Sequence, residues 1–176
     1  MKELSQHILD LIQNSISAGA SLIKVSIVRD GDMLSIEVDD NGCGMDADAV
    51  AKAVDPFFTH RSTRPVGLGL SLLAATAQRC DGHIEVHSEP GKGTSVVAVM
   101  HYDHIDRPPM GDIAGTMIAM IAGNPNIDFV YRYDIDGDAV VIDTRQVKEA
   151  LGEIPINHPD VIRWLMQHIV EGSAVE

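Results

Sequence analysis

The 176-residue sequence is 45% hydrophobic and 22% charged, which is typical of a globular domain long enough to bury its own core. Its net charge of −13 argues against a nucleic-acid partner, because phosphate backbones select clustered lysine and arginine side chains. No apolar run approaches the roughly 20 residues of a membrane helix, and the first residues do not resemble a signal peptide. We therefore expect a soluble, cytoplasmic protein without a membrane span, whose two cysteines, Cys43 and Cys80, are reduced.

The first hundred residues alternate between helix and strand patterns. Apolar residues at helical spacing predict a helix over 4–18, which Gly19 ends. Alternating apolar residues over 23–27 and 34–38 predict two strands, and the Asp30-Gly31-Asp32 turn between them predicts a hairpin. The elements expected after this hairpin are a glycine loop at 41–45, a short helix at 46–54, a loop at 55–66, a helix at 68–80 and strands at 83–88 and 94–100.

The sequence changes character after Arg107-Pro108-Pro109. The elements expected beyond it are an apolar helix at 113–122, strands at 127–133 and 139–143 joined by Asp136-Gly137, and helices near 145–151 and 160–170. We therefore divide the chain into a core of residues 1–107 and a C-terminal α/β extension of residues 108–176 that packs on the core and completes its fold.

Four short segments are candidates for chemistry, and each is ambiguous by itself. Asp10 and Asn14 share one face of the first helix, where polar residues are also plain solvent contacts. Asp40-Asn41-Gly42-Cys43-Gly44 ends a strand with a carboxylate and two glycines that allow close approach of a planar ligand, although Asp-Gly turns are common. Pro65-Val66-Gly67-Leu68-Gly69-Leu70 opens a helix and suits either a bound phosphate or tight packing. Gly91-Lys92-Gly93-Thr94 is also an ordinary hairpin connection.

The order and spacing of these segments resemble the GHKL superfamily of sensor histidine kinases, gyrase-type topoisomerases, mismatch-repair ATPases and related chaperones. The resemblance covers about residues 4–100. The segments most like the catalytic domain of a histidine kinase are Asp55-Pro56-Phe57-Phe58-Thr59, Gly67–Leu72 and Ser88–Thr94, and those equally like mismatch-repair ATPases are Asn14–Ala20 and Asp40–Gly44. The resemblance implies an α/β (α+β) fold of the Bergerat type, a two-layer sandwich of a mixed β-sheet with helices on one face.

The resemblance also implies a site for ATP and Mg²⁺. Asn14 is implied to hold Mg²⁺ through its amide oxygen, because magnesium needs hard oxygen ligands. Asp40 is implied to accept a hydrogen bond from the adenine amino group, and Thr94 to reach the same edge of the base, often through water. The residues implied to line the base are Gly42, Gly44 and Met45. Those implied to surround the phosphates, with the arginines neutralising charge, are Arg61, Arg64, Gly67, Leu68, Gly69 and Leu70.

Three departures from the family pattern bear on activity. Position 10 is Asp, where hydrolysing members usually carry Glu and many kinases carry Asn, so Asp10 is the candidate catalytic residue. The first glycine of the usual GxGLGL is Pro65, and the lid between Phe58 and Gly67 is short. Because the sequence shows no phosphoacceptor helix pair before the first helix, we do not expect self-phosphorylation in the standard cis arrangement.

Two functions remain open. In the first, the protein is a histidine-kinase-like enzyme in signalling that passes the γ-phosphate of ATP to a histidine or serine of an unidentified partner protein. In the second, it is an ATP-dependent switch with slow or absent hydrolysis, whose bound nucleotide sets the shape presented to a partner. The kinase-like segments favour the first, whereas the missing phosphoacceptor and the absent Glu at position 10 favour the second. The sequence leaves open whether the protein forms a homodimer.

Histidines at three places invite further interpretations. His60 lies in the lid and is a candidate γ-phosphate contact. His7 is interpreted as helix surface beside the pocket. The histidines and aspartates at 101–106 suggest a metal site, but side chains on an extended segment do not converge at this spacing, so we expect a solvated loop.

Overall fold

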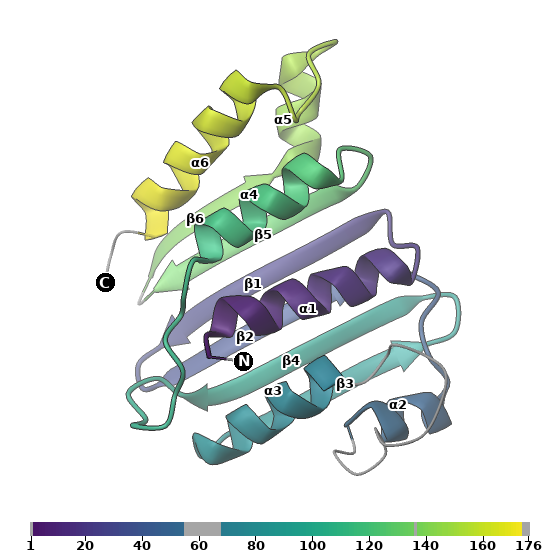
Figure 1. Ribbon diagram of the computed structural model, residues 1–176, viewed down its shortest axis with the longest axis vertical. Coiled ribbons are helices and arrows are strands. Elements are labelled where there is room, and N and C mark those ends of the chain that lie inside the picture. Colours follow the sequence, from purple (N-terminus) through teal and green to yellow (C-terminus); the bar gives the residue numbers. More distant parts are fainter. Residues whose placement is uncertain (1, 55–67, 136, 174–176) are drawn as a thin grey trace.

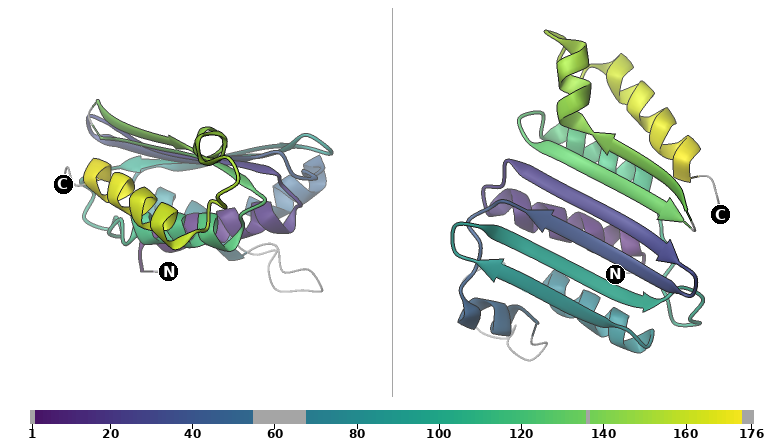
Figure 2. Two further views of the ribbon diagram at one scale, coloured as in Figure 1. Left: turned by 90° about the horizontal axis from the view of Figure 1, so that it is seen from above. Right: turned by 180° about the vertical axis from the view of Figure 1, so that it is seen from behind.

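A six-stranded β-sheet forms one layer of the computed structural model, which describes residues 2–54, 68–135 and 137–173. Four helices form the second layer and cover one face of the sheet (Figure 1, Figure 2): α1 (Leu4–Ser17), α3 (Leu68–Arg79), α4 (Ile113–Gly123) and α6 (Pro159–Ser173). The other elements are α2 (Ala47–Val54), α5 (Thr144–Leu151), β1 (Leu22–Asp30), β2 (Met33–Asp40), β3 (His83–Glu89), β4 (Gly93–His101), β5 (Asp128–Ile135) and β6 (Asp138–Asp143). The expected two-layer α/β architecture is confirmed.

The sheet has the strand order β3-β4-β2-β1-β5-β6. Neighbouring strands are antiparallel except for β1 and β5, which run parallel in a register that pairs Ile23 with Phe129. The β1–β2 hairpin turns at Gly31, whose positive φ of 57° costs glycine less than any residue with a Cβ. The central strand β1 is therefore paired along both of its edges, by β2 from the first hundred residues and by β5 from the C-terminal part.

One hydrophobic core extends from the first helix to the last. It contains the fully buried side chains of Leu4 in α1, Ile23 in β1, Met117 in α4, Phe129 in β5 and Leu165 in α6. Full burial of one such side chain stabilises the fold by roughly 1.5–3 kcal/mol. Side chains beyond residue 108 thus pack in the same hydrophobic core as those of the first hundred residues. The boundary between residues 107 and 108 stays a prediction.

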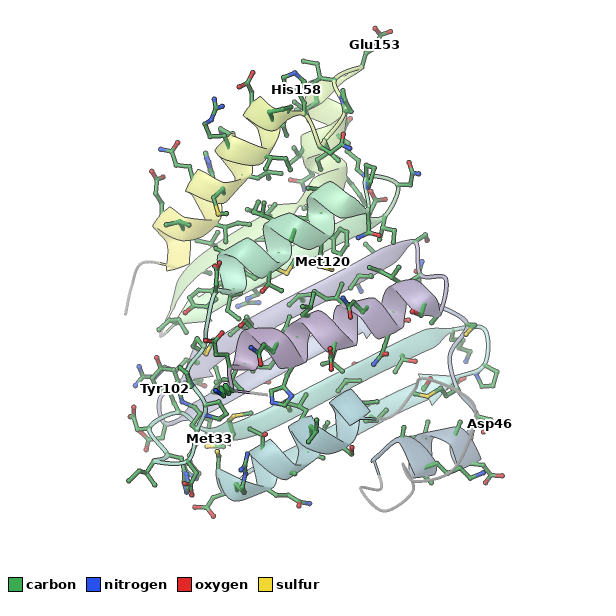
Figure 3. The ribbon with its side chains drawn as sticks, in the orientation of Figure 1. Met33, Asp46, Tyr102, Met120, Glu153 and His158 are labelled. Carbon is green, nitrogen blue, oxygen red and sulfur yellow. The ribbon has the colours of Figure 1, made fainter. Side chains whose placement is uncertain are left out.

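The two ends of the sheet differ in character. At one end α1 and β2 finish and α3 and β4 begin, and Asp46, just before α2, marks this end in Figure 3. At the opposite end, where Figure 3 labels Tyr102, the central carbons of the Arg29 and Arg107 guanidinium groups lie 3.9 and 4.5 Å from the centre of the Tyr102 ring. These cation–π contacts hold the segment that leads from β4 toward α4. The candidate functional residues that the structure describes lie toward the first end.

Most predicted elements agree with the structure to within two residues at each end. The helix expected at 68–80 is α3, which ends one residue earlier, before a turn in which Asp81 has a positive φ of 55°. The strand expected at 127–133 is β5, shifted one residue forward at its start and two at its end. The loop expected at 55–66 lies outside the described residues. Within the described ranges, no helix is both long and apolar enough to span a membrane.

Candidate functional site

Asp40, the last residue of β2, is held in place by two hydrogen bonds to its carboxylate. The Ser15 hydroxyl donates to Oδ2 at 2.6 Å, and the Gly42 backbone N–H donates to Oδ1 at 2.8 Å. Ser15 is buried in α1, and its hydroxyl also lies 3.2 Å from the Leu11 carbonyl oxygen. A carboxylate that accepts two such bonds is fixed in orientation, so Asp40 can present its remaining lone pairs in a defined direction.

The glycine loop after β2 is tightly enclosed by neighbouring backbone. The Cys43 N–H donates a hydrogen bond to the Ala18 carbonyl oxygen, just after α1, at 2.9 Å. The Cys43 carbonyl oxygen accepts a hydrogen bond from the Gly91 N–H in the β3–β4 turn at 2.7 Å. A Cβ on Gly44, which has a positive φ of 67°, would overlap the Glu89 carbonyl oxygen. A Cβ on Gly42 would lie only 2.8 Å from the Ala18 Cβ. The chain's own packing therefore requires these glycines, whatever the loop binds.

Ser88 links the glycine loop to Thr94. Its hydroxyl accepts a hydrogen bond from the Met45 N–H at 2.8 Å, donates to the Gly93 carbonyl at 3.0 Å and lies 2.8 Å from the Thr94 hydroxyl. Thr94 is also the register partner of Asp40 in the β2–β4 ladder. The structure thus brings Asp40, Met45 and Thr94 together, while their role in binding a base stays a prediction.

Asp10 and Asn14 lie one turn apart on α1, and both side chains are half-buried. Asp10 is next to the start of α3, because a Cβ on Gly69 would lie 3.0 Å from Asp10 Oδ2. Burial raises the pKa of Asp10 above its usual range. The carboxylate thus stands beside the first turn of α3, where the backbone N–H groups of residues 68–70 lack partners within the helix.

The other predicted phosphate contacts are only partly described. Leu70 lies in the first turn of α3 with its side chain in the core, so only its backbone can reach a ligand. The backbone of Leu68 begins α3. Arg61, Arg64 and Gly67 lie outside the described residues, as does His60.

Three residues of the site were missed by the sequence analysis. Ser15 follows Leu11 and Ile12 at helical spacing, and a serine on an apolar stripe signals a buried partner, here Asp40. Ser88 ends an alternating strand just before the turn, where only its hydrogen bonds reveal its role. Asn41 Oδ1 accepts hydrogen bonds from the backbone N–H groups of residues 21 and 22, at 2.9 Å each, and so links the loop to the start of β1.

His7 does not lie on the helix surface, so that interpretation is wrong. The side chain is 2% exposed, because α1 packs against α3 and His7 lies beside residues of α3. Both ring nitrogens are buried, and none of the described residues forms a hydrogen bond with them. Burial, with smaller contributions from positive charges that include Arg79, lowers the pKa of His7 to about 4.

The described residues contain no group of three or more histidine, cysteine or acidic side chains placed to hold a metal ion, which includes the histidines and aspartates at 101–106. In that segment His104 instead pairs with Asp81, 3.5 Å from ring nitrogen to carboxylate oxygen. Both cysteines are free thiols, Cys43 exposed and Cys80 buried.

Comparisons with known proteins identify the family of the chain. A family model described as histidine kinase-, DNA gyrase B- and HSP90-like ATPase matches residues 2–104. The chain is 31% identical over 117 residues to the non-motile and phage-resistance protein of Caulobacter vibrioides, a match that covers 60% of the chain and 14% of that protein. It is 38% identical over 97 residues to the sensor histidine kinase RcsC of Escherichia coli, covering 52% and 10%. It is 32% identical over 104 residues to sporulation kinase B of Bacillus subtilis, covering 57% and 24%. The match therefore spans at most about a quarter of these relatives.

Two solved structures share the fold. The ATPase domain of MutL from Aquifex aeolicus, complexed with ADP, aligns with a TM-score of 0.52 at 14% identity over 100% of this chain and 98% of its own. The N-terminal domain of a DNA repair protein aligns with a TM-score of 0.56 at 18% identity over 81% of this chain and 52% of its own. At these identities the likeness shows the fold alone. The family model, however, covers more than half of the sequence, and the chain belongs to the histidine kinase-, DNA gyrase B- and HSP90-like ATPase family, the GHKL superfamily.

Proposed function

We propose that the end of the sheet around Asp40 binds ATP with Mg²⁺ and that the protein acts as a kinase-like enzyme on a partner protein in the cytoplasm. The observation that carries this proposal is the fixed Asp40 carboxylate, oriented by Ser15 and Gly42 beside Thr94. An oriented carboxylate accepts a hydrogen bond from the amino group of adenine, whereas the carbonyl that guanine has at the equivalent position would be repelled. This geometry supports selectivity for adenine over guanine.

The phosphates and the metal have suitable groups on α1 and α3. Mg²⁺ prefers hard oxygen ligands, and the Asn14 amide oxygen and the Asp10 carboxylate are oxygen donors one turn apart. When bound, the ion would neutralise phosphate charge. The N–H groups of Leu68, Gly69 and Leu70 at the start of α3 are suited to phosphate oxygens, because a helix N-terminus carries partial positive charge. We assign Gly67, Arg61 and Arg64 to the phosphates as well, and Gly42, Gly44 and Met45 to the base.

Replacement of Asp40 by Asn is expected to weaken ATP binding by roughly 1–3 kcal/mol, because an amide nitrogen then competes at a position that must accept a hydrogen. Calorimetry with purified protein measures this change. Asp39→Asn is the matched control, since Asp39 is the adjacent carboxylate and pairs with Lys24 at 2.9 Å instead. Asn14→Ala should remove the Mg²⁺ dependence of ATP affinity, with exposed Gln13→Ala as its control. If affinity is unchanged in both Asp40→Asn and Asn14→Ala, the assignment of the pocket fails.

Slow ATP turnover is expected from the isolated protein, below about 1 s⁻¹. Asp is shorter than Glu by one methylene, about 1.3–1.5 Å of reach, so Asp10 stops short of a water in line with the γ-phosphate. Asp10→Glu should therefore raise hydrolysis, and Asp10→Ala should lower it without loss of ATP affinity. A coupled phosphate-release assay measures both. Fast wild-type turnover that Asp10→Glu abolishes would contradict this account.

The second candidate function is an ATP-dependent conformational switch, favoured by Asp at position 10. Radioactive γ-phosphate separates the two: transfer of label to a candidate partner protein supports the kinase-like enzyme. Nucleotide-dependent association with that partner, without transfer of label, supports the switch. A size measurement on the same protein samples tests whether the protein forms a homodimer.

A further inference from the structure

A groove of about 550 Å³ is lined by residues of α1 and α3, none of which is assigned to the nucleotide. The two helices are antiparallel, with Asp10 next to Gly69 at one end and His7 near Arg79 at the other. The residues that line the groove are His7, Leu72, Ala75, Thr76, Gln78 and Arg79. Its volume falls in the range of about 300–1,000 Å³ that is usual for small-molecule pockets.

One of the lining residues, His7, is a buried polar side chain without a hydrogen-bond partner among the described residues. The His7 side chain is only 2% exposed, yet no described residue forms a hydrogen bond with either of its ring nitrogens. Buried polar atoms are nearly always paired, because an unpaired one loses its hydrogen bonds to water without replacement. Because the low pKa of about 4 keeps the ring neutral at neutral pH, one nitrogen is an N–H donor and the other an acceptor.

Hydrogen-bond donors and apolar surface are combined in this groove. The Arg79 Nη2 donates to the Thr76 hydroxyl at 3.3 Å, which directs the guanidinium along the helix toward the groove. Leu72, 41% exposed, and Ala75 supply apolar surface on α3. A guanidinium and an imidazole N–H beside apolar side chains suit a carboxylate that is attached to a hydrocarbon group.

We propose that the groove between α1 and α3 binds a small organic acid, whose carboxylate accepts hydrogen bonds from Arg79 and the His7 N–H and whose apolar part lies on Leu72 and Ala75. Because both ring nitrogens of His7 are buried, this proposal requires the exposed side chains of Gln78 and Arg79, which line the groove, to move when the acid binds. The site uses none of the residues assigned to ATP, and it stands or falls independently of the proposed function.

The test is a titration of the full chain with benzoate and with hexanoate in the absence of nucleotide, followed by nitrogen NMR of the histidine rings. We expect a saturable shift of the His7 resonances. Arg79→Gln should weaken binding by about tenfold or more, because it removes the charged donor. Arg163→Gln makes the same charge change on α6, where Arg163 pairs with Asp160 at 3.0 Å, and should leave binding unchanged.

Three results would overturn the proposal. The first is the absence of any saturable His7 shift up to about 50 mM acid, well beyond the millimolar affinities of weak ligands. The second is equal weakening by Arg79→Gln and Arg163→Gln. The third is equal binding of benzyl alcohol, which keeps the ring of benzoate and lacks its charge. Since Arg79 is exposed, Arg79→Gln should retain the fold, which a thermal melt checks.

Discussion

A fragment that ends after Met100 is expected to lose cooperative unfolding or to aggregate. Without β5, the parallel partner of β1, the backbone of one whole edge of β1 is left unpaired and open to other chains. The fragment also lacks Met117, Phe129 and Tyr131, each fully buried in the shared core. At roughly 1.5–3 kcal/mol per buried side chain, these three alone approach the 5–15 kcal/mol of a typical domain. Circular dichroism melts and sedimentation of the fragment measure the outcome.

A fragment of residues 1–151 is the control for this truncation. It keeps α4, β5 and β6, together with the buried Thr144 hydroxyl, which accepts a hydrogen bond from the Phe129 N–H at 2.8 Å. It lacks α6 and should unfold cooperatively at a lower temperature than the full chain. If residues 1–100 alone melt cooperatively and bind ATP as the full chain does, the C-terminal part is an independent addition.

Acidification is expected to destabilise the protein through His7 by about 3 kcal/mol. The pKa of His7 is about 4 in the folded protein, against 6.5 as its ordinary value. Between these values the unfolded chain binds a proton that the folded chain excludes, so protonation favours unfolding. The contribution of His7 is intact above about pH 6.5 and is lost progressively as the pH falls toward 4, by about 1.4 kcal/mol for each unit of the shift.

His7→Leu should remove this part of the pH dependence. Urea unfolding at a series of pH values measures it, as the difference between the profiles of the variant and of the wild type. His101→Leu is the matched control, because His101 is exposed at the end of β4. Other acidic groups, including Asp10, titrate in all three proteins and cancel in the differences. Identical acid sensitivity in wild type and His7→Leu would show that His7 does not cause it.

Local patterns made most of the fold predictable. The alternation of Ile23, Val25 and Ile27 predicted β1, and a turn at Gly31 predicted its antiparallel partner. The parallel pairing of β1 with β5 carries no such local signal, because no turn joins the two strands. Its only sequence clue was indirect: an extension with a helix and a hairpin suited to cover an exposed edge.

In the candidate site, too, the residues within one sequence motif were predictable, whereas contacts between elements far apart in the sequence were not. Asp40 and Gly42 were recognisable because they lie two residues apart in one motif. Their support from Ser15 depends on how α1 packs against β2, which the sequence of neither element states. His7 was misplaced although it follows Leu4 by three residues and precedes Leu11 by four, on the apolar stripe of the helix. A histidine tolerates either environment, so only the position of α3 decides that it is buried.

The pairing of β1 with β5 also has a consequence for the order of events during translation. Its register joins residues about 100 positions apart, such as Ile23 and Phe129, so this contact closes late and slowly. At about 5–20 residues per second, the ribosome adds β5 roughly 5–20 s after β1. In the last part of that interval β1 to β4 have all been synthesised, and the Asp40 end of the sheet can assemble before β5 exists. We expect the nascent chain to depend in this interval on chaperones that shield the open side of β1.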